Sequence, residues 1–489
     1  MKLSNLFGEF IPTAVYTDGA LDPDPEIRGI CTDLSEVKEG YLFAAVKGIK
    51  FDGYRLCGKA EELGAVALLT DRPAERTAAV NIVVPNVRKA LAVFSAAFYG
   101  NPSQDLRLVG ITGTNGKTTV SYMLGHILNS YGRPTAILGT AGYVSPSGDS
   151  VSAPYTTPEP ILLHKQLALI RDGGGEFVVM EVSSQALDQK RVYGLEFEVG
   201  IITNITVDHL DYHKSFRAYK EAKLKLLPMS EKRVLNADSS ELYPYISFSD
   251  VICFSSTGKD ASVSAEDVNI LPDGGVSFSI RYEGALYPVK LALPGLFNVS
   301  NALAAFCAAC ALGIPPDVSA KALFSFRGVK GRCERVDVNR DFSVMIDFAH
   351  TPDGLSNILT ALRPFVKGRL ICVFGCGGDR DRSKRPLMGK IAADRSDYVF
   401  ITSDNPRSEP GMAIINDILE GIKNGCPIEV IPDRKLAIER ALAFAEKDDL
   451  VLIAGKGHEE YQIVGDRKIE FDERKIIKDF LSRKEDSVE

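Results

Sequence analysis

Apolar and polar positions along this chain follow two alternating patterns. Short apolar runs rich in Val and Ile, such as 106–112, 177–182 and 199–205, have the length of buried strands. Between them, stretches such as 120–128 repeat apolar residues at roughly helical spacing. This alternation of strand and helix predicts an α/β protein built on mostly parallel sheets with right-handed crossovers.

The pattern also divides the sequence into three blocks. Because 489 residues exceed what one core usually holds, we expect three domains, 1–103, 104–330 and 331–489. The first block has short strands and one helix-like run at 59–65, which is typical of a small α/β domain. In the second, alternating strands and helices lead to a β-rich piece at 276–294 and then a helix.

Four strand signals in the third block each end in a polar cluster. They cover 342–353, 369–381, 397–407 and 449–461. Solvated turns are polar in any protein, which explains Asp and Asn but not the repeated Arg, His and Gly. Because ligands bind beyond the carboxyl ends of strands in open α/β sheets, we expect the four clusters to form one site.

Composition narrows the class of partner. A formal charge of -7, with acids and bases interspersed, argues against nucleic-acid binding and favours small-molecule substrates. The first residues lack the apolar run of a signal peptide, and no stretch of about 18 uninterrupted apolar residues could span a membrane. We therefore expect a cytoplasmic protein with neither a membrane nor a nucleic-acid partner. A monomer is a further expectation, which no feature of the sequence decides.

The cysteines do not change this expectation, because all nine are scattered and mostly lie in apolar contexts. Cys307 and Cys310 form a CxxC pair within a stretch that is typical of a buried helix. Since no second Cys or His pair has zinc spacing, we expect packing there rather than metal or redox chemistry.

The stretch 106–119 reads LRLVGITGTNGKTT, an apolar strand that runs into a glycine-rich turn. Gly113 and Gly116 let backbone N–H groups converge on phosphate oxygens, Lys117 would reach the β- and γ-phosphates, and Thr118 would ligate Mg²⁺. The common motif places its first glycine at Ile111, whereas here the nearest glycine is one residue earlier. A chance Gly-Lys-Thr is the alternative, but strand, turn and helix follow in the required order, which predicts a nucleotide triphosphate site.

Acidic and histidine residues follow two further strands of the second block. Glu181 ends the strand near 177–182, where a buried carboxylate needs a partner that a metal ion supplies. Asp208 and His209 follow the next strand, and most of the six histidines lie in such clusters. This distribution favours a function for His209 and His350.

Several motifs occur in the order found in Mur ligases, and the sequence resembles that family over essentially its whole length. They are GTNGKTT (113–119), TTPEP (156–160), MEVSSQAL (180–187), TNITVDHLDYH (203–213), FNVSNALAA (297–305), GRCER (331–335), DFAHTPD (347–353), GGDRDRSKRPLMG (377–389), SDNPR (403–407) and GKGHEEY (455–461). The resemblance implies a small N-terminal α/β UDP-binding domain, a central P-loop ATPase domain with a mostly parallel sheet, and a C-terminal Rossmann-like domain that binds an amino acid.

The resemblance also implies the reaction. In these enzymes ATP phosphorylates a carboxylate, here the D-glutamate γ-carboxylate of UDP-N-acetylmuramoyl-L-alanyl-D-glutamate. An amine attacks the acyl phosphate, and the tetrahedral intermediate loses phosphate to leave an amide. Activation is needed because a carboxylate is a poor electrophile, so the task of the protein is mainly positioning and charge stabilisation.

Site residues follow from the resemblance position by position. Those implied in catalysis are Lys117, Glu181, His209 and Lys223. Those implied for ATP are Gly113, Thr114, Asn115, Gly116, Lys117, Thr118, Thr119, Asn298, Arg332, Asp347 and His350. Those implied for Mg²⁺ are Thr118, Glu181, His209 and Lys223. Those implied for the UDP-muramoyl dipeptide are Asp33, Ser35, Thr156, Thr157, Ser183, Gln189, Arg191 and Lys223. The Asp-Ser-Arg motif that binds uridine in the family reads Asp33-Leu34-Ser35 here.

Arg332 lies just past the junction between the second and third blocks, so we expect ATP to bind between domains.

Lys223 matches a lysine that the family carries as a carbamate. An ammonium beside Mg²⁺ and the reacting phosphate would be repelled, whereas a carbamate is an anion that can ligate a hard cation. Without the resemblance, Lys220, Lys223 and Lys225 look like a solvated helix face, and only the family match selects Lys223.

The added amino acid is implied to be meso-2,6-diaminopimelate. Arg407 ends a four-residue motif of enzymes that use this substrate, and a guanidinium can grip its second carboxylate with two parallel hydrogen bonds. The residues implied in this contact are Arg380, Asp404, Asn405, Arg407, Gly455 and Glu459, with Glu459 suited to the distal ammonium. L-lysine as the added residue, folate polyglutamylation and an ATP-binding module without catalysis remain as alternatives.

Overall fold

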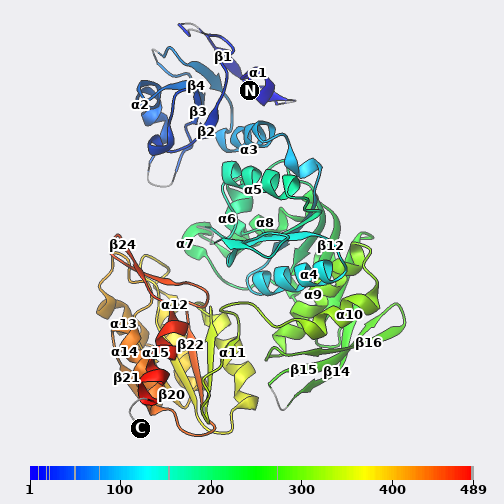
Figure 1. Ribbon diagram of the computed structural model, residues 1–489, viewed down its shortest axis with the longest axis vertical. Coiled ribbons are helices and arrows are strands. Elements are labelled where there is room, and N and C mark those ends of the chain that lie inside the picture. Colours follow the sequence, from blue (N-terminus) through cyan, green and yellow to red (C-terminus); the bar gives the residue numbers. More distant parts are fainter. Residues whose placement is uncertain are drawn as a thin grey trace. The chain divides into compact units, whose positions relative to one another are not determined.

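The computed structural model describes residues 1–485 except 9, 18, 21, 49–50, 76, 152–154, 272–273 and 424. The chain forms two compact units. Unit 1 comprises Met1–Thr112, Leu128–Ile201 and Glu221–Arg233, and unit 2 comprises Gly113–Ile127, Ile202–Lys220 and Val234–Glu489. Both contain sheets with helices packed on them, so the α/β fold class is confirmed (Figure 1).

The N-terminal part of unit 1 is a five-stranded sheet with strand order β1-β5-β4-β3-β2. Strands β2 to β5 run parallel, and β1 is antiparallel to β5. The bounds are α1 Ser4–Phe7, β1 Ala14–Tyr16, β2 Gly29–Cys31, β3 Tyr41–Ala44, α2 Cys57–Glu62, β4 Ala65–Thr70, β5 Val80–Val83 and α3 Val87–Phe98. The expected short strands and the helix near 59–65 are therefore present.

Helix α3 corrects the expectation of a single helix in this block. The Asn86 side chain caps it by accepting the Lys89 N–H at 3.0 Å. Its buried residues Leu91 and Phe94 recur at helical spacing and pack with Leu42 of the sheet. In Figure 1, α3 lies beside α5 of the same unit.

The rest of unit 1 holds the strands in the order β12-β11-β6-β10-β7-β8-β9. Strand β10 is parallel to β6 and β7, and the short β8 and β9 continue antiparallel. The bounds are β6 Arg107–Thr112, β7 Thr135–Gly139, β8 Gly142–Val144, β9 Ser150–Val151, α5 Pro160–Asp172, β10 Phe177–Glu181, α6 Ser184–Asp188, β11 Phe197–Ile202, α8 Phe216–Leu224 and β12 Ser230–Asn236. Strand β6 therefore ends where the glycine-rich turn begins, and β10 ends on Glu181.

Unit 2 begins with helix α4 and continues from the last residues of β12 through a β-rich region. Strands β13 to β16 follow β12 in order, with β14, β15 and β16 antiparallel. The bounds are α4 Lys117–Ser130, α7 Leu210–His213, β13 Val251–Ser255, β14 Val263–Ile270, β15 Val276–Tyr282, β16 Ala285–Leu291, α9 Phe297–Ala311 and α10 Pro316–Ser325. Helix α9 is buried on nearly all sides, and Cys307 packs within it as a free thiol whose pKa is raised by burial.

The C-terminal part of unit 2 is a six-stranded sheet with order β17-β18-β22-β19-β20-β21. All neighbours from β18 to β21 are parallel. The bounds are β17 Glu334–Val336, β18 Ser343–Asp347, α11 Pro352–Leu362, β19 Leu370–Phe374, α12 Lys384–Arg395, β20 Tyr398–Ile401, α13 Gly411–Leu419, β21 Ile428–Val430, α14 Arg434–Phe444, β22 Leu450–Ala454, β23 Tyr461–Val464, β24 Arg467–Glu470 and α15 Glu473–Glu485.

Alternate residues of this sheet point to opposite faces. Cys372 and Phe374 of β19 pack with α11, α12 and α13, whereas Ile371 and Val373 pack with α14 and α15. Since β18, β22, β19 and β20 are parallel neighbours, their carboxyl ends meet at one edge of the sheet. The four polar clusters of the third block follow these ends, as expected from the sequence.

A buried ion pair anchors α12 to the loop that follows β20. The Arg385 guanidinium is fully buried, contacts both carboxylate oxygens of Glu409 at 2.9 and 2.7 Å, and reaches Asp417 at 2.8 Å. We expect Arg385→Met to cost about 3–5 kcal/mol of stability, because it leaves these carboxylates without their shared cation. The midpoint of thermal unfolding measures the loss.

Arg382 provides the matched control, since it also pairs with Asp417 but is 65% exposed. An exposed pair contributes about 0–1 kcal/mol, so Arg382→Met should unfold close to the wild-type temperature. Equal losses for the two variants would contradict the structural role assigned to Arg385.

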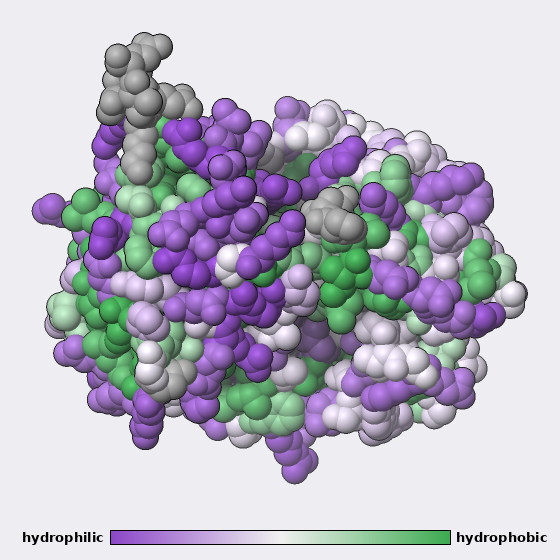
Figure 2. Space-filling view, turned by 90° about the horizontal axis from the view of Figure 1, so that it is seen from below, coloured by the Kyte–Doolittle hydropathy of each residue, from purple (hydrophilic) through white to green (hydrophobic). Residues whose placement is uncertain are grey.

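The face shown in Figure 2 has hydrophilic and hydrophobic residues interspersed. In the part of the chain that the structure describes, no helix is both long and apolar enough to cross a membrane.

Candidate active site

The turn 113–119, here called the phosphate loop, is shaped by two glycines with positive φ. Gly113 has φ +151°, and a Cβ there would lie 1.9 Å from Thr203 Oγ1. Gly116 has φ +87°, and a Cβ there would lie 2.4 Å from Asn301 Oδ1. Only glycine fits this close approach.

Residues 203–206 hold the phosphate loop from one side. Thr203 Oγ1 donates to Asn115 O at 2.5 Å, and Asn204 accepts the Asn115 N–H at 2.9 Å through its side chain. Thr114 Oγ1 accepts the Thr206 N–H at 2.9 Å. The Lys117 ammonium lies over the loop and donates to the carbonyl oxygens of Gly113 and Thr114, both at 2.9 Å. Thr118 and Thr119 are buried in the first turn of α4.

C-terminal residues of unit 2 also contact the phosphate loop. Arg332 Nη2 donates to Thr118 Oγ1 at 3.1 Å, and Asn115 Nδ2 donates to Asp353 Oδ2 at 2.5 Å. Asp353 stands at the start of α11, directly after the DFAHTP residues. Unit 2 therefore brings Arg332 to the loop that the sequence predicts for ATP.

Asp347 and Asn298 are both buried, and each has a fixed orientation. Asp347 accepts the N–H groups of Cys333 and Ala349, both at 2.8 Å, while burial raises its pKa despite the nearby Arg332. Asn298 Nδ2 donates to Pro294 O at 2.7 Å, and its Oδ1 accepts from Asn301.

Two histidines of unit 2, His209 and His350, lie near an acidic and a backbone acceptor, respectively. His209 has φ +53°, and its Nε2 lies 3.4 Å from Asp208 Oδ2. Burial opposes ionisation of Asp208, but His209 and His350 offset it and keep its pKa below the ordinary value. His350 Nδ1 lies 2.8 Å from Phe348 O.

Glu181, in unit 1, is fully buried and both its carboxylate oxygens have donors. The Thr140 N–H and hydroxyl donate to Oε1 and Oε2, each at 2.9 Å. A hydroxyl has one proton, and that of Thr140 is donated to Glu181. The Thr156 hydroxyl, whose oxygen lies 3.0 Å from Thr140 Oγ1, must therefore donate to Thr140. Glu181 and Thr156 therefore share a neighbour that the sequence did not single out.

Most of the residues expected to bind the UDP-muramoyl dipeptide gather near Glu181. Thr157 Oγ1 donates to the Glu181 carbonyl at 2.9 Å and accepts the Ser183 N–H at 3.0 Å. Arg191 donates to Thr157 O at 2.8 Å and to Gln189 Oε1 at 3.0 and 2.7 Å. This part of unit 1 thus brings Thr156, Thr157, Ser183, Gln189 and Arg191 together around the end of β10.

Lys223 differs from its lysine neighbours in burial. It is 2% exposed, whereas Lys220 pairs with Glu241 and Lys225 with Asp188 at the surface. A solvated helix face is therefore wrong for Lys223. In the N-terminal sheet, Asp33 caps a turn by accepting the Ser35 N–H and hydroxyl at 2.9 and 2.7 Å.

The residues expected to bind diaminopimelate lie on Asp404–Arg407, here called the recognition loop, and on the turns that pack against it. Arg407 has φ +52°, its Nη1 donates to Gly378 O at 2.8 Å, and it is half-buried. Burial and the nearby Arg380 lower its pKa below the ordinary value. Two guanidiniums this close to each other favour an anion beside them.

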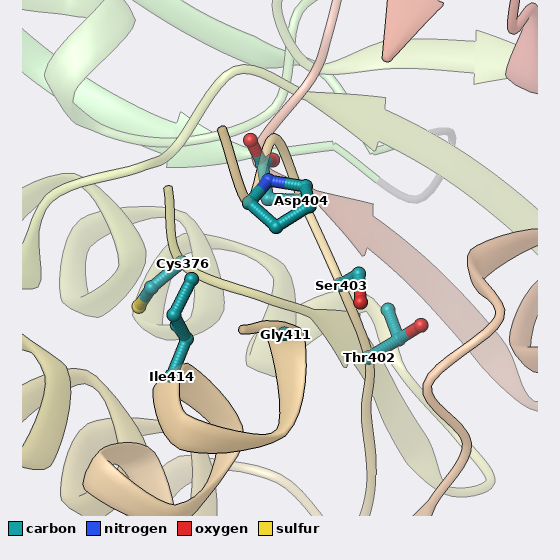
Figure 3. Close-up of a pocket in the computed structure, with 7 residues that line it drawn as sticks. Cys376, Thr402, Ser403, Asp404, Gly411 and Ile414 are labelled. Carbon is teal, nitrogen blue, oxygen red and sulfur yellow. The ribbon is translucent and has the colours of Figure 1, made fainter. Parts of the chain in front are cut away.

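Two glycines before Arg380, Gly377 and Gly378, allow the recognition loop to approach closely because they lack a Cβ. A Cβ on Gly377 would lie 2.9 Å from Arg407 Nη1, and one on Gly378 would lie 1.9 Å from Pro406 O. The loop also borders a small pocket lined by Cys376, Thr402, Ser403, Asp404, Pro406, Gly411 and Ile414 (Figure 3).

The turn after β22 carries Gly455 and Glu459. Gly455 has φ +119°, and a Cβ there would lie 2.8 Å from Asp404 Oδ2. That oxygen is buried and has no hydrogen-bond partner among the described residues. Burial opposes ionisation of Asp404, but Lys456 and Arg434 keep its pKa below the ordinary value. Asn405 Nδ2 donates to Glu459 Oε2 at 2.9 Å.

Sequence reasoning missed residues that act on these side chains through contacts. They are Thr140, Asn301, Asp353, Gly377, Gly378 and Lys456. All except Thr140 lie within motifs that carry the family resemblance, so their positions, though not their contacts, had a signal in the sequence.

Comparison with known families defines the class of protein. Family models match in three segments: the Mur ligase family catalytic domain at 26–99, the Mur ligase middle domain at 111–309 and the Mur ligase glutamate ligase domain at 331–457. Together with the relatives below, these matches show that the chain belongs to the Mur ligase family.

Several near-full-length relatives of this chain within the family share one name. UDP-N-acetylmuramoyl-L-alanyl-D-glutamate–2,6-diaminopimelate ligase from Caldanaerobacter subterraneus subsp. tengcongensis is 44% identical, over 95% of this chain and 96% of the relative. The enzyme of the same name from Syntrophomonas wolfei is 43% identical, over 99% of this chain and 100% of the relative. A solved structure of an enzyme with this name is 30% identical in sequence. The match covers 94% of this chain and 95% of that structure, with a TM-score of 0.66.

Proposed function

We propose that this chain is an ATP-dependent amide ligase that adds meso-2,6-diaminopimelate to the D-glutamate γ-carboxylate of UDP-N-acetylmuramoyl-L-alanyl-D-glutamate. The observation that carries the proposal is the recognition loop, where Arg407 and Arg380 lie together and Glu459 is bound to Asn405. Near-full-length relatives that bear the name of this ligase support it.

ATP activates the γ-carboxylate as an acyl phosphate. In our proposal the backbone N–H groups of the phosphate loop and the Lys117 ammonium bind the phosphates, and Arg332, Asn298, Asp347 and His350 bind the rest of ATP. The amine of diaminopimelate then attacks the acyl carbon, and phosphate leaves with the bonding electrons. Thr156, Thr157, Ser183, Gln189 and Arg191 hold the dipeptide, and Asp33 and Ser35 the uridine.

Mg²⁺ is proposed to accompany ATP. Among the described residues no group of three or more His, Cys, Asp or Glu side chains could hold a metal ion. The donor set nevertheless fits, because Mg²⁺ is usually held by one or two carboxylates together with substrate phosphates. Thr118, Glu181, His209 and a Lys223 carbamate would hold it, and it would offset phosphate charge. The burial of Lys223 suits this modification, because a carbamate is negative and the metal ion that it would bind offsets its charge.

Specificity for the amino acid follows from the two ends of diaminopimelate. Its distal carboxylate suits Arg407 and Arg380, while its distal ammonium suits Glu459 and Asp404. L-lysine lacks the carboxylate and would leave a half-buried guanidinium without an anion. A site built for a polar group can reject an analogue without it by about 10⁴-fold.

Phosphate release from purified protein with ATP, Mg²⁺ and the UDP-dipeptide tests the proposal. We expect release to depend on meso-diaminopimelate. Release with L-lysine alone would overturn the specificity, release only with a folate and glutamate would favour folate polyglutamylation, and no release at all would favour a binding module.

Thr140 offers a test of the role of Glu181. Thr140→Val keeps the shape of the side chain but removes the hydroxyl that donates to Glu181 Oε2. A hydrogen bond to a charged group is worth about 1.5–3 kcal/mol, so we expect about a tenfold higher Mg²⁺ concentration for half-maximal activity. A Mg²⁺ titration of initial rates measures this. Thr360→Val makes the same change on an exposed residue of α11 and should leave the titration unchanged; equal shifts in both would contradict the role.

The proposal includes three domains with boundaries 1–103, 104–330 and 331–489, and a monomer that works in the cytoplasm on small-molecule substrates. It also places the enzyme in peptidoglycan precursor synthesis, where the ligases named above act on the same substrate.

A further inference from the structure

Lys456 is a fully buried lysine beneath the recognition loop. It lies between two glycines with positive φ, Gly455 and Gly457, directly after β22. A buried ammonium is costly unless its protons find acceptors. Lys456 Nζ donates to Asn405 Oδ1 at 3.0 Å and to Glu459 Oε2 at 3.2 Å, which are two of the groups proposed to bind diaminopimelate.

These contacts fix the orientation of the Asn405 amide. Its Oδ1 receives both the Lys456 ammonium and the Ile463 N–H, the latter at 2.9 Å. An amide nitrogen cannot accept two donors, so the NH₂ group must point to Glu459 Oε2, which it reaches at 2.9 Å. Removal of the ammonium would take away one of the two donors that hold this orientation.

The same contacts distinguish the two carboxylate oxygens of Glu459. Oε2 receives Lys456 and Asn405, whereas among the described residues Oε1 receives only the Tyr461 hydroxyl, at 3.5 Å. The Glu459 side chain is 18% exposed, so Oε1 is the oxygen able to take a further cationic donor.

The hairpin β23–β24 supports the same loop through its backbone. Arg407 N donates to Ile463 O at 3.1 Å, Gly465 N donates to Arg407 O at 2.8 Å, and Gln462 Nε2 donates to Asp404 O at 2.6 Å. The hairpin therefore holds the loop backbone at Asp404 and Arg407 and shares Asn405 Oδ1 with Lys456, whereas Glu459 Oε2 receives Lys456 and Asn405.

We propose that Lys456 is a positioning residue that directs Glu459 Oε1 toward the distal ammonium of diaminopimelate and so sets the preference for an amino acid carrying that ammonium. This inference rests on the proposed function. Lys456 acts through Glu459 and Asn405 and does not itself touch the substrate.

The test compares two ligands in Lys456→Met and wild type. One is meso-diaminopimelate and the other is L-2-aminopimelate, an alternative substrate that keeps the reacting amine and the distal carboxylate but lacks the distal amine; both are scored by kcat/KM. We expect kcat/KM for meso-diaminopimelate to fall about 10- to 100-fold, mainly through KM, with a much smaller change for L-2-aminopimelate. Equal losses for both ligands would overturn the proposal, because they indicate general damage to the site.

A double-mutant cycle adds an independent readout. Once Glu459→Gln has removed the carboxylate, Lys456→Met should cost little more, whereas additive losses would overturn the coupling. Lys468→Met is the matched control, because this exposed lysine of β24 lies 3.8 Å from the centroid of the same Tyr461 ring that Lys456 approaches. It should leave both constants unchanged.

Three further outcomes are decisive. If Lys456→Met does not fold, Lys456→Gln, which keeps a donor without the charge, takes its place. Failure of both to fold would make Lys456 a structural residue and overturn the proposal. Wild type that does not use meso-diaminopimelate would overturn the proposed function itself, whereas unchanged ligand preference in an active Lys456→Met overturns this inference alone.

Discussion

Arg407→Leu is expected to lose about 10²- to 10³-fold in kcat/KM for meso-diaminopimelate, with nearly unchanged KM values for ATP and the UDP-dipeptide. The reason is that removal of one partner of a desolvated charge pair costs about 2–5 kcal/mol. Arg407 is half-buried, held by Gly378 O, and lies close enough to Arg380 for its pKa to be lowered. Steady-state kinetics with each substrate varied in turn measures the effect.

Arg467→Leu is the control, because this exposed arginine of β24 pairs with Val464 near Arg407 but makes no contact that the mechanism uses. It should behave like wild type. Loss of ATP binding in Arg407→Leu, or unchanged use of meso-diaminopimelate, would mean that the arginine has another role.

Lys117→Met is expected to lower kcat/KM for ATP by about 10³-fold, since it removes a fixed positive charge from the place where phosphate charge develops. Methionine nearly keeps the length of the side chain but cannot donate to Gly113 O and Thr114 O, so the loop also loses two hydrogen bonds. ATP-dependent phosphate release at saturating amino acid measures the loss.

Lys321→Met makes the same change on the surface of α10, where the lysine side chain is 81% exposed. It should retain full activity and wild-type stability. If Lys117→Met kept phosphate release within about tenfold of wild type, the phosphate loop would not supply the charge that the mechanism requires.

Much of the fold was predictable because strands of parallel sheets are continuous apolar runs. The four strand signals of the third block became β18, β19, β20 and β22, and their carboxyl ends meet at one edge of a sheet. Helix α3 was missed although Asn86 and the spacing of its buried residues signal it. The hairpin β23–β24 was missed because its residues are mostly exposed and show no apolar pattern.

The candidate site was predictable where chemistry is written into a local motif, as in the phosphate loop and the recognition loop. It was not predictable where a role depends on burial or on a distant partner. Without the family match Lys223 looks like the polar lysines beside it, and nothing within GKGHEEY singled out Lys456; the structure distinguishes both lysines by their burial. Thr140 likewise acquires its contact from Glu181, which is remote in the sequence.

A competition between two amino acids tests the central claim most directly. Equal amounts of meso-diaminopimelate and L-lysine are incubated with the protein, ATP, Mg²⁺ and UDP-N-acetylmuramoyl-L-alanyl-D-glutamate, and the product is weighed by mass spectrometry. The account predicts that the UDP-dipeptide gains the mass of a diaminopimelate residue, with one phosphate released per amide formed. A product that carries lysine, or an unchanged dipeptide despite ATP hydrolysis, would contradict it.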